Sequence, residues 1–311
     1  MRRREIELLA ARFVPGAGTP DIHSLGGGSF NETYRVVRGG TAYALRFSPP
    51  RGRDLGIDRV WEAQVLGCAT NAGLAPTVEY FDPPRGILIS RWVEGRFWTP
   101  ALVSQDAYLR RIADLVRRIH GLPMPVPTRV RSPLNWIDQY ATAALRAGIA
   151  APGGAALRAI ADARLAELAR LPGVPCVLCH GDLHTLNLIE KIPDGGGCSE
   201  SEPSLVLLDW EYAHAADPLW DLAGWIANND LEHDISHELL TIYTGHEPSP
   251  HQRQRLALLC WLYDYVCLLW NALYLKRQPG MRRVDPAADG VSVRARLLAA
   301  RLAIGSNDRL E

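Results

Sequence analysis

Two short apolar runs, each followed by acidic and polar residues, limit what this chain can fold into more than any other feature. The first run is Val-Leu-Cys at residues 177–179, and the second is Leu-Val-Leu-Leu at residues 205–208. Apolar runs of this length are typical of buried β-strands. A short buried strand that delivers polar side chains at its end is a common way to build a rigid active site. We therefore place the candidate site of this chain within residues 175–225.

The polar residues at the ends of these runs fit the chemistry of phosphoryl transfer from a nucleotide. His180, Asp182 and Asn187 follow the first run, and Asp209 and Glu211 follow the second. In this chemistry one aspartate accepts the proton of the substrate hydroxyl, while an asparagine and a second aspartate hold the Mg²⁺ that bridges the phosphates. Such a hard cation prefers oxygen ligands. We therefore predict that Asp182 is the catalytic base and that Asn187 and Asp209 are metal ligands.

Three motifs in a fixed order give the chain a resemblance to a known family. The motifs are HGDLHTLN (residues 180–187), LLDWEYA (207–213) and DPLWDLA (217–223). With them the sequence resembles the aminoglycoside phosphotransferase family of small-molecule kinases, which share the protein-kinase fold and include choline/ethanolamine kinases and thiamine kinases. Leu45-Arg46 and the DWEY run at residues 209–212 make the choline/ethanolamine branch our first expectation, and the thiamine kinases, which share the DWEYA pattern, come next.

This resemblance covers the chain from about residue 25 to about residue 275 and implies its fold. We expect an α+β, two-lobed protein-kinase-like architecture. Residues 1–92 would form an N-lobe with a five-stranded antiparallel sheet and a glycine-rich nucleotide loop, and residues 93–311 a mainly helical C-lobe with the catalytic and acceptor-binding groups.

Composition excludes some other classes of function. The 34 basic and 34 acidic residues give a formal net charge of +0, which argues against nucleic acid as a partner. The basic N-terminus is interrupted by Glu5 and Glu7 and is followed by no apolar segment, so it does not indicate a signal peptide.

Cys176 and Cys179 form an isolated C-x-x-C pair, which we interpret as buried thiols in a reducing cytosol rather than as a zinc or redox site. We expect a cytoplasmic protein.

The N-terminal part reads as one helix followed by strands and glycine-rich turns. Alternation at residues 33–37 and 43–47 predicts two strands joined by a Gly-Gly turn, and residues 76–81 and 86–92 predict two more. A glycine run between paired strands lets backbone N–H groups approach a phosphate, so we expect nucleotide contacts from Gly27, Gly28, Ser29 and Asn31.

Two charged residues are expected beside that loop. By the resemblance, Arg46 occupies the position of the cation that contacts the nucleotide phosphates, and its fork could pair with phosphate and with a helix carboxylate. Glu62, in a segment with helical spacing of apolar residues, would supply that carboxylate. Asp58 or Arg59 could serve instead. Residues 90–95 would form the hinge that binds the adenine of ATP, an assignment that rests on the resemblance.

Further helices are predicted at residues 108–120, 135–147 and 155–171, with a proline-rich loop at 123–133. Asp217 is expected to cap a helix that starts near Pro218, and the resemblance implies that Asp221 braces the catalytic loop. Residues 194–199 are predicted to be a hairpin insertion without function.

The apolar segment 256–275 nearly reaches the ~20 residues of a membrane span. Asp264 at its centre favours a buried helix and no membrane span.

Aromatic residues near an acidic residue make this last helix a candidate for binding a cation. Trp261, Tyr265 and Trp270 lie around Asp264, and aromatic faces with a carboxylate attract an ammonium ion. Packing in the core is the alternative for each ring. In choline kinases the tryptophan matching Trp270 and the tyrosine matching Tyr212 line the choline site, and we also assign Glu211 to the acceptor site.

The chain departs from these relatives at two positions. Cys267 stands where better-known relatives carry another tryptophan, and Asn228 stands where choline and thiamine kinases tend to have a glutamate. Both changes would weaken the binding of a cation, for which Asp230 or Asp264 could compensate.

The sequence thus predicts a kinase that uses ATP and Mg²⁺ to phosphorylate the hydroxyl of a small cationic alcohol, with choline or ethanolamine first. A thiamine kinase and an aminoglycoside phosphotransferase are the alternatives of the same class. A non-catalytic nucleotide-binding module is an alternative of another class, and it would be supported by the loss of Asp182, Asn187 or Asp209. All three are present.

Overall fold

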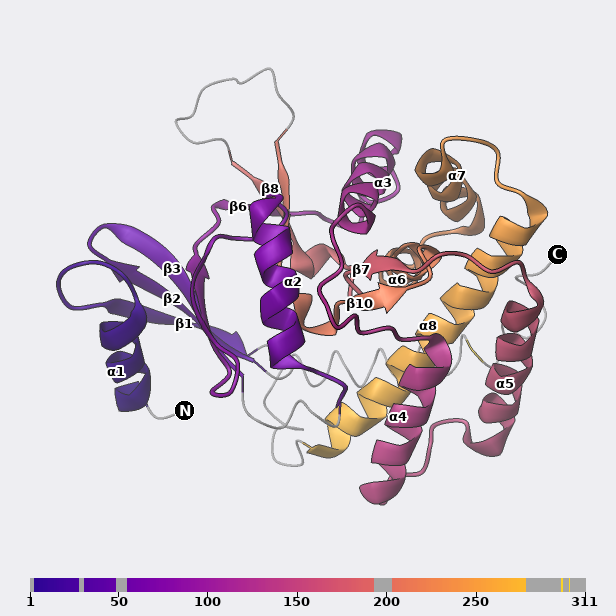
Figure 1. Ribbon diagram of the computed structural model, residues 1–311, viewed down its shortest axis with the longest axis horizontal. Coiled ribbons are helices and arrows are strands. Elements are labelled where there is room, and N and C mark those ends of the chain that lie inside the picture. The colour runs from indigo at the N-terminus through magenta and orange to yellow at the C-terminus, as the bar shows by residue number, and fades with distance from the viewer. Residues whose placement is uncertain are drawn as a thin grey trace. The chain divides into compact units, whose positions relative to one another are not determined.

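The computed structural model describes residues 3–27, 31–48, 55–192 and 203–277, together with Leu298 and Leu302. Figure 1 shows the chain as a ribbon coloured from the N- to the C-terminus. The chain divides into two compact units, which are described separately. Unit 1 comprises Met1–Arg53, Ile57–Phe97 and Leu186–Glu211, and unit 2 comprises Asp54–Gly56, Trp98–Thr185 and Tyr212–Glu311.

Unit 1 is built on a five-stranded antiparallel sheet with the strand order β1-β2-β3-β5-β4. Its strands are β1 (Asp21–Gly27), β2 (Glu32–Arg38), β3 (Thr41–Phe47), β4 (Val78–Asp82) and β5 (Ile87–Arg91). Gly39 and Gly40 have positive φ angles of 57° and 78° and form the tight turn between β2 and β3, a geometry in which a side chain would be strained. The predicted antiparallel sheet and its Gly-Gly turn are confirmed.

Helix α1 (Arg3–Phe13) and the sheet share one apolar core. Ala10 of the helix and Val14 just after it are buried together with Val36, Tyr43 and Leu45, which alternate along the strands. Because strand side chains point to opposite faces in turn, these alternating residues all face the helix.

Helix α2 (Arg59–Asn71) begins at Asp58, whose carboxylate accepts hydrogen bonds from the N–H groups of Val60 (3.0 Å) and Trp61 (3.2 Å). Asp58 is therefore the N-cap of this helix, which stabilises the first turn. Within the helix, Trp61, Glu62 and Val65 are all buried.

A second, three-stranded sheet of unit 1 has the order β6-β8-β9. Its strands are β6 (Gly95–Phe97), β8 (Leu188–Lys191) and β9 (Leu205–Leu207). The N–H of Leu207 also donates to the carbonyl of Leu74, 2.8 Å away. These contacts join residues 186–211 to unit 1, whereas the sequence-based division assigned them to the C-lobe. The lobe boundary at residue 92 stays a prediction.

Unit 2 is mainly helical, as predicted. Its helices are α3 (Asp106–His120), α4 (Pro133–Arg146), α5 (Gly154–Arg170), α6 (Leu219–Asn229), α7 (His233–Thr244) and α8 (Pro250–Arg277). The long helix α8 packs against α4, α5 and α6, and α3 packs against α7 (Figure 1). Two short antiparallel strands, β7 (Val177–Cys179) and β10 (His214–Ala216), complete it.

Several helix boundaries differ from the predicted ones. Helix α4 begins at Pro133, because Ser132 and Asn135 form a capping box in front of it. Helix α8 begins at Pro250, six residues before the predicted start at 256. Helix α7 was not predicted. Asp217 accepts a hydrogen bond from the N–H of Leu219 (2.9 Å) and so stabilises the start of α6, but the N-cap position itself is occupied by Pro218.

Helix α8 contains the described segment that most resembles a membrane span. Within it, Pro250–Leu275 is long and apolar enough to cross a membrane by length and composition alone, and 78% of its most apolar window is buried inside the protein. Asp264, at its centre, is 3% exposed. The burial agrees with the prediction of a core helix.

Candidate active site

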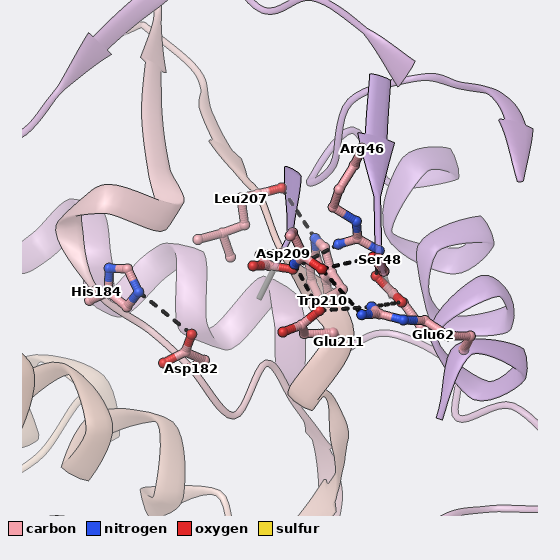
Figure 2. Close-up of polar contacts among 11 residues, drawn as sticks. Arg46, Ser48, Glu62, Asp182, His184, Leu207, Asp209, Trp210 and Glu211 are labelled. Carbon is pink, nitrogen blue, oxygen red and sulfur yellow. Dashed lines mark hydrogen bonds and ion pairs between the residues drawn. The ribbon is translucent and has the colours of Figure 1, made fainter. Parts of the chain in front are cut away.

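In unit 1, Arg46 lies between two carboxylates. Arg46 lies on β3. One of its guanidinium nitrogens donates to Glu62 Oε1 of α2 at 2.5 Å, and another donates to Asp209 Oδ1 at 2.7 Å (Figure 2). The Glu62 side chain has no exposed surface. Burial alone would raise the pKa of Glu62, but the charges of Arg46 and Arg59 hold it below its ordinary value. The structure thus pairs Arg46 with Glu62, the helix carboxylate that was predicted for it.

A second arginine, Arg59, contributes equally to this cluster. Its guanidinium lies 2.7 Å from Glu62 Oε2 and 2.7 Å from Glu211 Oε2. The sequence offered Arg59 only as an alternative to Glu62, whereas the structure uses both. Arg59 and Glu62 are three residues apart, a spacing that places two side chains on the same face of a helix, and this spacing could have predicted that they act together.

Asn31 and Glu211 also belong to this group. The Asn31 amide donates to Glu211 Oε2 at 3.0 Å, and its oxygen accepts from the Ser48 hydroxyl at 2.7 Å. Glu211 was assigned to the acceptor, but it lies with residues assigned to the nucleotide. Its contact with Asn31 joins positions 180 residues apart in the chain.

The two predicted metal ligands are brought together by strand pairing. Leu188 of β8 lies opposite Leu207 of β9. Since the strands are antiparallel, Asn187, just before β8, and Asp209, just after β9, lie at the same end of the pair. The N–H of Leu208 donates to the carbonyl of Asn187 at 2.8 Å. Asp209 has a positive φ of 57°, which is uncommon for a residue with a side chain and is found at functional sites.

The charge of this cluster suits a divalent cation. Three carboxylates (Glu62, Asp209 and Glu211) contact two arginines (Arg46 and Arg59), so the cluster carries one excess negative charge when all three carboxylates are ionised. Burial and the neighbouring charge of Glu211 raise the pKa of Asp209 above its ordinary value, and Arg46 opposes them. A cation bound to Asp209 would remove this penalty. Carboxylate and amide oxygens are the donors that Mg²⁺ prefers, so the residues present fit the metal.

The glycine-rich loop is described only at its edges. Gly27 ends β1 and pairs with Glu32 of β2, and Gly26 before it has a positive φ of 84°. Gly28 and Ser29, the other predicted phosphate contacts, lie outside the described residues, as does the insertion at 194–199. The assignment of this loop to the nucleotide stays a prediction.

In unit 2, Asp182 lies on the loop after β7, which is held by α6. The backbone N–H groups of His180 and Gly181 donate to the two carboxylate oxygens of Asp221, each at 2.9 Å. Gly181 has a positive φ of 79°, and a Cβ there would come within 2.5 Å of the Tyr212 carbonyl, so only glycine fits. The Asp182 carboxylate is partly exposed and lies 3.5 Å from His184 Nε2 (Figure 2).

Asp221 is itself held by a second pair of residues. His120 Nε2 lies 3.3 Å from Asp221 Oδ2, and His120 Nδ1 lies 2.8 Å from the Tyr243 hydroxyl. Although burial opposes it, the hydrogen bond from His120 lowers the pKa of Asp221. The brace implied for Asp221 is present, and His120 and Tyr243 extend it.

The cysteine pair differs from its predicted state. Cys179 is buried, but Cys176 is exposed. Cys179 lies with His120 and Asp221 in a group whose potential ligand atoms are within 4.8 Å of one another. Burial raises the pKa of the Cys179 thiol well above its ordinary value, so this thiol stays protonated.

The two aromatic residues predicted for the acceptor contact each other. The indole N–H of Trp270 donates to the Tyr212 hydroxyl at 2.7 Å, and the Trp270 ring stacks on Tyr274 at 5.4 Å. Trp136 of α4, which sequence reasoning missed, lies 6.0 Å from the Tyr212 ring. By contrast, the guanidinium of Arg164 lies over the ring of Trp261, 5.0 Å from its centroid. For Trp261 this contact favours packing within the protein over binding of a cationic ligand.

Comparisons with known proteins agree with this fold. Residues 21–256 match the model of a family described as the phosphotransferase enzyme family. No curated protein matches the chain.

Among solved structures, a choline/ethanolamine kinase family protein from Mesorhizobium loti is 24% identical, with a TM-score of 0.71 and coverage of 98% of this chain and 100% of that one. Choline kinase LicA from Streptococcus pneumoniae is 22% identical (TM-score 0.72, coverage 96% and 98%), and a LicA structure in complex with AMP also matches. The macrolide 2'-phosphotransferase MphH from Brachybacterium faecium is 22% identical (TM-score 0.60, coverage 94% and 97%). These similarities confirm the α+β, two-lobed protein-kinase-like fold.

Proposed function

Because this chain belongs to the phosphotransferase enzyme family, we propose that it transfers a phosphoryl group from ATP, with Mg²⁺, to the hydroxyl of a small cationic alcohol. Choline and ethanolamine are the leading acceptors. The observation that carries the cationic acceptor is the hydrogen bond from Trp270 to the Tyr212 hydroxyl, which fixes two aromatic rings in one orientation.

The nucleotide and the metal are assigned to unit 1. Arg46 and Arg59 supply positive charge for the phosphates, and Glu62 holds both guanidinium groups in place. Asn187 and Asp209 would hold the Mg²⁺, which neutralises charge that develops on the phosphates during transfer. The AMP complex of LicA supports the choice of an adenine nucleotide.

The acceptor chemistry is assigned to Asp182. Its carboxylate orients the acceptor hydroxyl and takes its proton, a role that requires an ionised and accessible group. The loop is kept rigid by the two backbone hydrogen bonds to Asp221. A fixed loop keeps the carboxylate in one position, and such positioning supplies much of the rate in phosphoryl transfer.

The aromatic pair is assigned to the ammonium group. Tyr212 and Trp270 are both partly exposed, so their rings retain surface for a ligand. A cation over an aromatic face gains about 0.5–2 kcal/mol, with the larger value where water is excluded. Cys267 offers no ring in this region, so affinity for choline should be modest.

A panel of acceptors tests the proposal. Purified protein with ATP and Mg²⁺ is given choline, ethanolamine, thiamine, an aminoglycoside or a neutral sugar alcohol, and the release of ADP is measured. Faster ADP release with choline or ethanolamine than with the others supports it. ADP release with the neutral sugar alcohol alone would reject the cationic acceptor but leave the kinase activity standing. Preference for thiamine or the aminoglycoside would select one of the alternatives.

A further inference from the structure

Helix α6 holds the loop that carries Asp182 at two points, one on each side of this residue. On the N-terminal side, Asp221 accepts the N–H groups of His180 and Gly181. On the C-terminal side, the amide nitrogen of Asn228 donates to the carbonyl of Leu183 at 2.8 Å. Asp182 therefore lies between two anchors that come from a single helix.

The spacing of the two anchors follows from helix geometry. Asp221 lies in the first turn of α6 and Asn228 in the last, seven residues later. Seven residues are about two turns, so both side chains point from the same face and lie about 10 Å apart along the axis. Three loop residues, His180, Gly181 and Leu183, thus contact one rigid element.

Asn228 is itself held by helix α8. Its amide nitrogen lies 3.1 Å from the hydroxyl of Tyr263, a residue that is 4% exposed. The Tyr263 ring lies against Gly224, one turn before Asn228, where a Cβ would approach the ring to 3.0 Å. The ring also lies 5.1 Å from that of Trp220. Gly224 thus leaves the space that Tyr263 needs to reach Asn228.

The contact with the Leu183 carbonyl requires a side chain that donates a hydrogen bond. The Asn228 NH₂ group supplies two donors, and the Leu183 carbonyl and the Tyr263 hydroxyl both lie within hydrogen-bond distance of it. An ionised carboxylate has no donor and would face the Leu183 carbonyl with an oxygen. The amide nitrogen of Asn228 thus makes a contact with the loop that a carboxylate could not make.

On the basis of the proposed function above, we propose that Asn228, supported by Tyr263, is a positioning residue for Asp182. It touches no reacting atom. It fixes the backbone directly after Asp182, as Asp221 fixes the backbone before it.

Asn228→Ala tests this with a matched control on the same helix. The next residue, Asn229, is also partly buried, but its amide donates to Trp225 of its own helix at 2.8 Å. With the best acceptor of the panel, Asn228→Ala should lower kcat ~10-fold or more, because small misplacements of a catalytic group are costly. The KM for ATP should stay within about twofold, and Asn229→Ala should resemble wild type in both constants. Tyr263→Phe should give a smaller loss of kcat than Asn228→Ala.

A double variant separates positioning from a general structural effect. If Asn228 acts through Asp182, Asn228→Ala should cost less than about twofold in kcat once Asp182→Asn is present. An equal loss in both backgrounds would overturn the proposal. Near-normal turnover of Asp182→Asn alone would instead reject the proposed function.

Hydrogen exchange gives a second readout that needs no acceptor. The backbone amides of residues 183–187 should exchange faster in Asn228→Ala than in wild type, and not in Asn229→Ala. Unchanged exchange in Asn228→Ala would show that this side chain does not hold the loop, whatever the enzyme phosphorylates.

Discussion

The guanidinium of Arg46 donates to the carboxylate of Glu62, and this carboxylate has no exposed surface. Arg59 donates to the other oxygen of the same carboxylate. Removing one partner of a buried ion pair leaves the other partner's charge without compensation. Glu62 therefore links the stability of unit 1 to the arginines that we assign to the nucleotide.

Glu62→Ala should lower the free energy of unfolding by about 3 kcal/mol, because two guanidinium groups lose their shared carboxylate. It should also raise the KM for ATP. Urea denaturation and steady-state kinetics measure both effects. Glu94, whose side chain is 69% exposed and lies 3.8 Å from Arg35, provides the control variant Glu94→Ala. Equal stability of the two variants would show that the Glu62 ion pairs do not stabilise the protein.

Asp182→Asn should lower turnover by about two to four decades, the usual contribution of a general base. Binding of ATP should change little, since Asp182 is assigned to the acceptor. Turnover is measured by ADP release and nucleotide affinity by calorimetry. Asp234→Asn, at a fully exposed aspartate of α7, is the matched control. Retention of near-normal turnover by Asp182→Asn would remove the assignment of the base.

Asp209→Ala should abolish Mg²⁺-dependent turnover of ATP, because Asp209 is the charged member of the proposed metal pair. Asn187→Ala should shift the Mg²⁺ dependence to higher concentration without abolishing turnover. Both are measured by Mg²⁺ titration, with Asp138→Ala at an exposed ion pair as control. A wild-type titration curve for Asp209→Ala would place the metal elsewhere.

Trp270→Ala should raise the KM for the cationic acceptor about tenfold, which corresponds to about 1.4 kcal/mol of lost binding. The KM for ATP should change little. Trp270→Phe keeps an aromatic face but loses the hydrogen bond to Tyr212, so it should fall between Ala and wild type. If Ala and Phe gave equal KM values near that of wild type, the ring would serve packing alone.

His214 should make the stability of the protein depend on pH. Its Nδ1 lies 2.7 Å from the Tyr212 carbonyl, its Nε2 lies 3.4 Å from the indole nitrogen of Trp136, and burial lowers its pKa from 6.5 to about 4. Between its unfolded and its folded pKa, the histidine binds a proton in the unfolded state but stays neutral in the folded state. Lowering the pH through this range therefore favours the unfolded state. The free energy of unfolding should therefore decrease by up to about 3 kcal/mol between pH 6.5 and 4.

Urea denaturation at several pH values, compared between wild type and His214→Gln, measures this effect. The decrease should be smaller in His214→Gln by the share that His214 contributes. His233→Gln, at an 82% exposed histidine, should keep the wild-type slope. Parallel curves for wild type and His214→Gln would mean that His214 is not buried in its neutral form.

The elements that could be predicted from the sequence are those specified locally. The strands of unit 1 alternate in polarity and are joined by Gly39-Gly40, and both signals lie within a few residues. Helix α7 escaped prediction because Glu232 at its start makes no side-chain cap and its last turns carry β-branched and aromatic residues. The start of α8 lies in a polar segment that the apolar pattern does not include.

The candidate site divides in the same way. Asp182, Asn187 and Asp209 were found because each follows a short apolar run, which is a local signal, and their roles stay predictions. The contact between Asn31 and Glu211 and that between Arg59 and Glu211 join residues 180 and 152 positions apart. No pattern along the chain encodes such pairs. Likewise, the sequence marks Asn228 only as a departure from relatives, and its bond to Leu183 appears only in the fold.

Detection of the phosphorylated product tests the central claim most directly. Wild type and Asp182→Asn are incubated with ATP, Mg²⁺ and either choline, ethanolamine or a neutral sugar alcohol, and the products are followed by phosphorus NMR. Our account predicts a phosphomonoester of choline or ethanolamine with wild type, and its loss with Asp182→Asn. The appearance of inorganic phosphate alone, or of a phosphomonoester only with the neutral sugar alcohol, would contradict it.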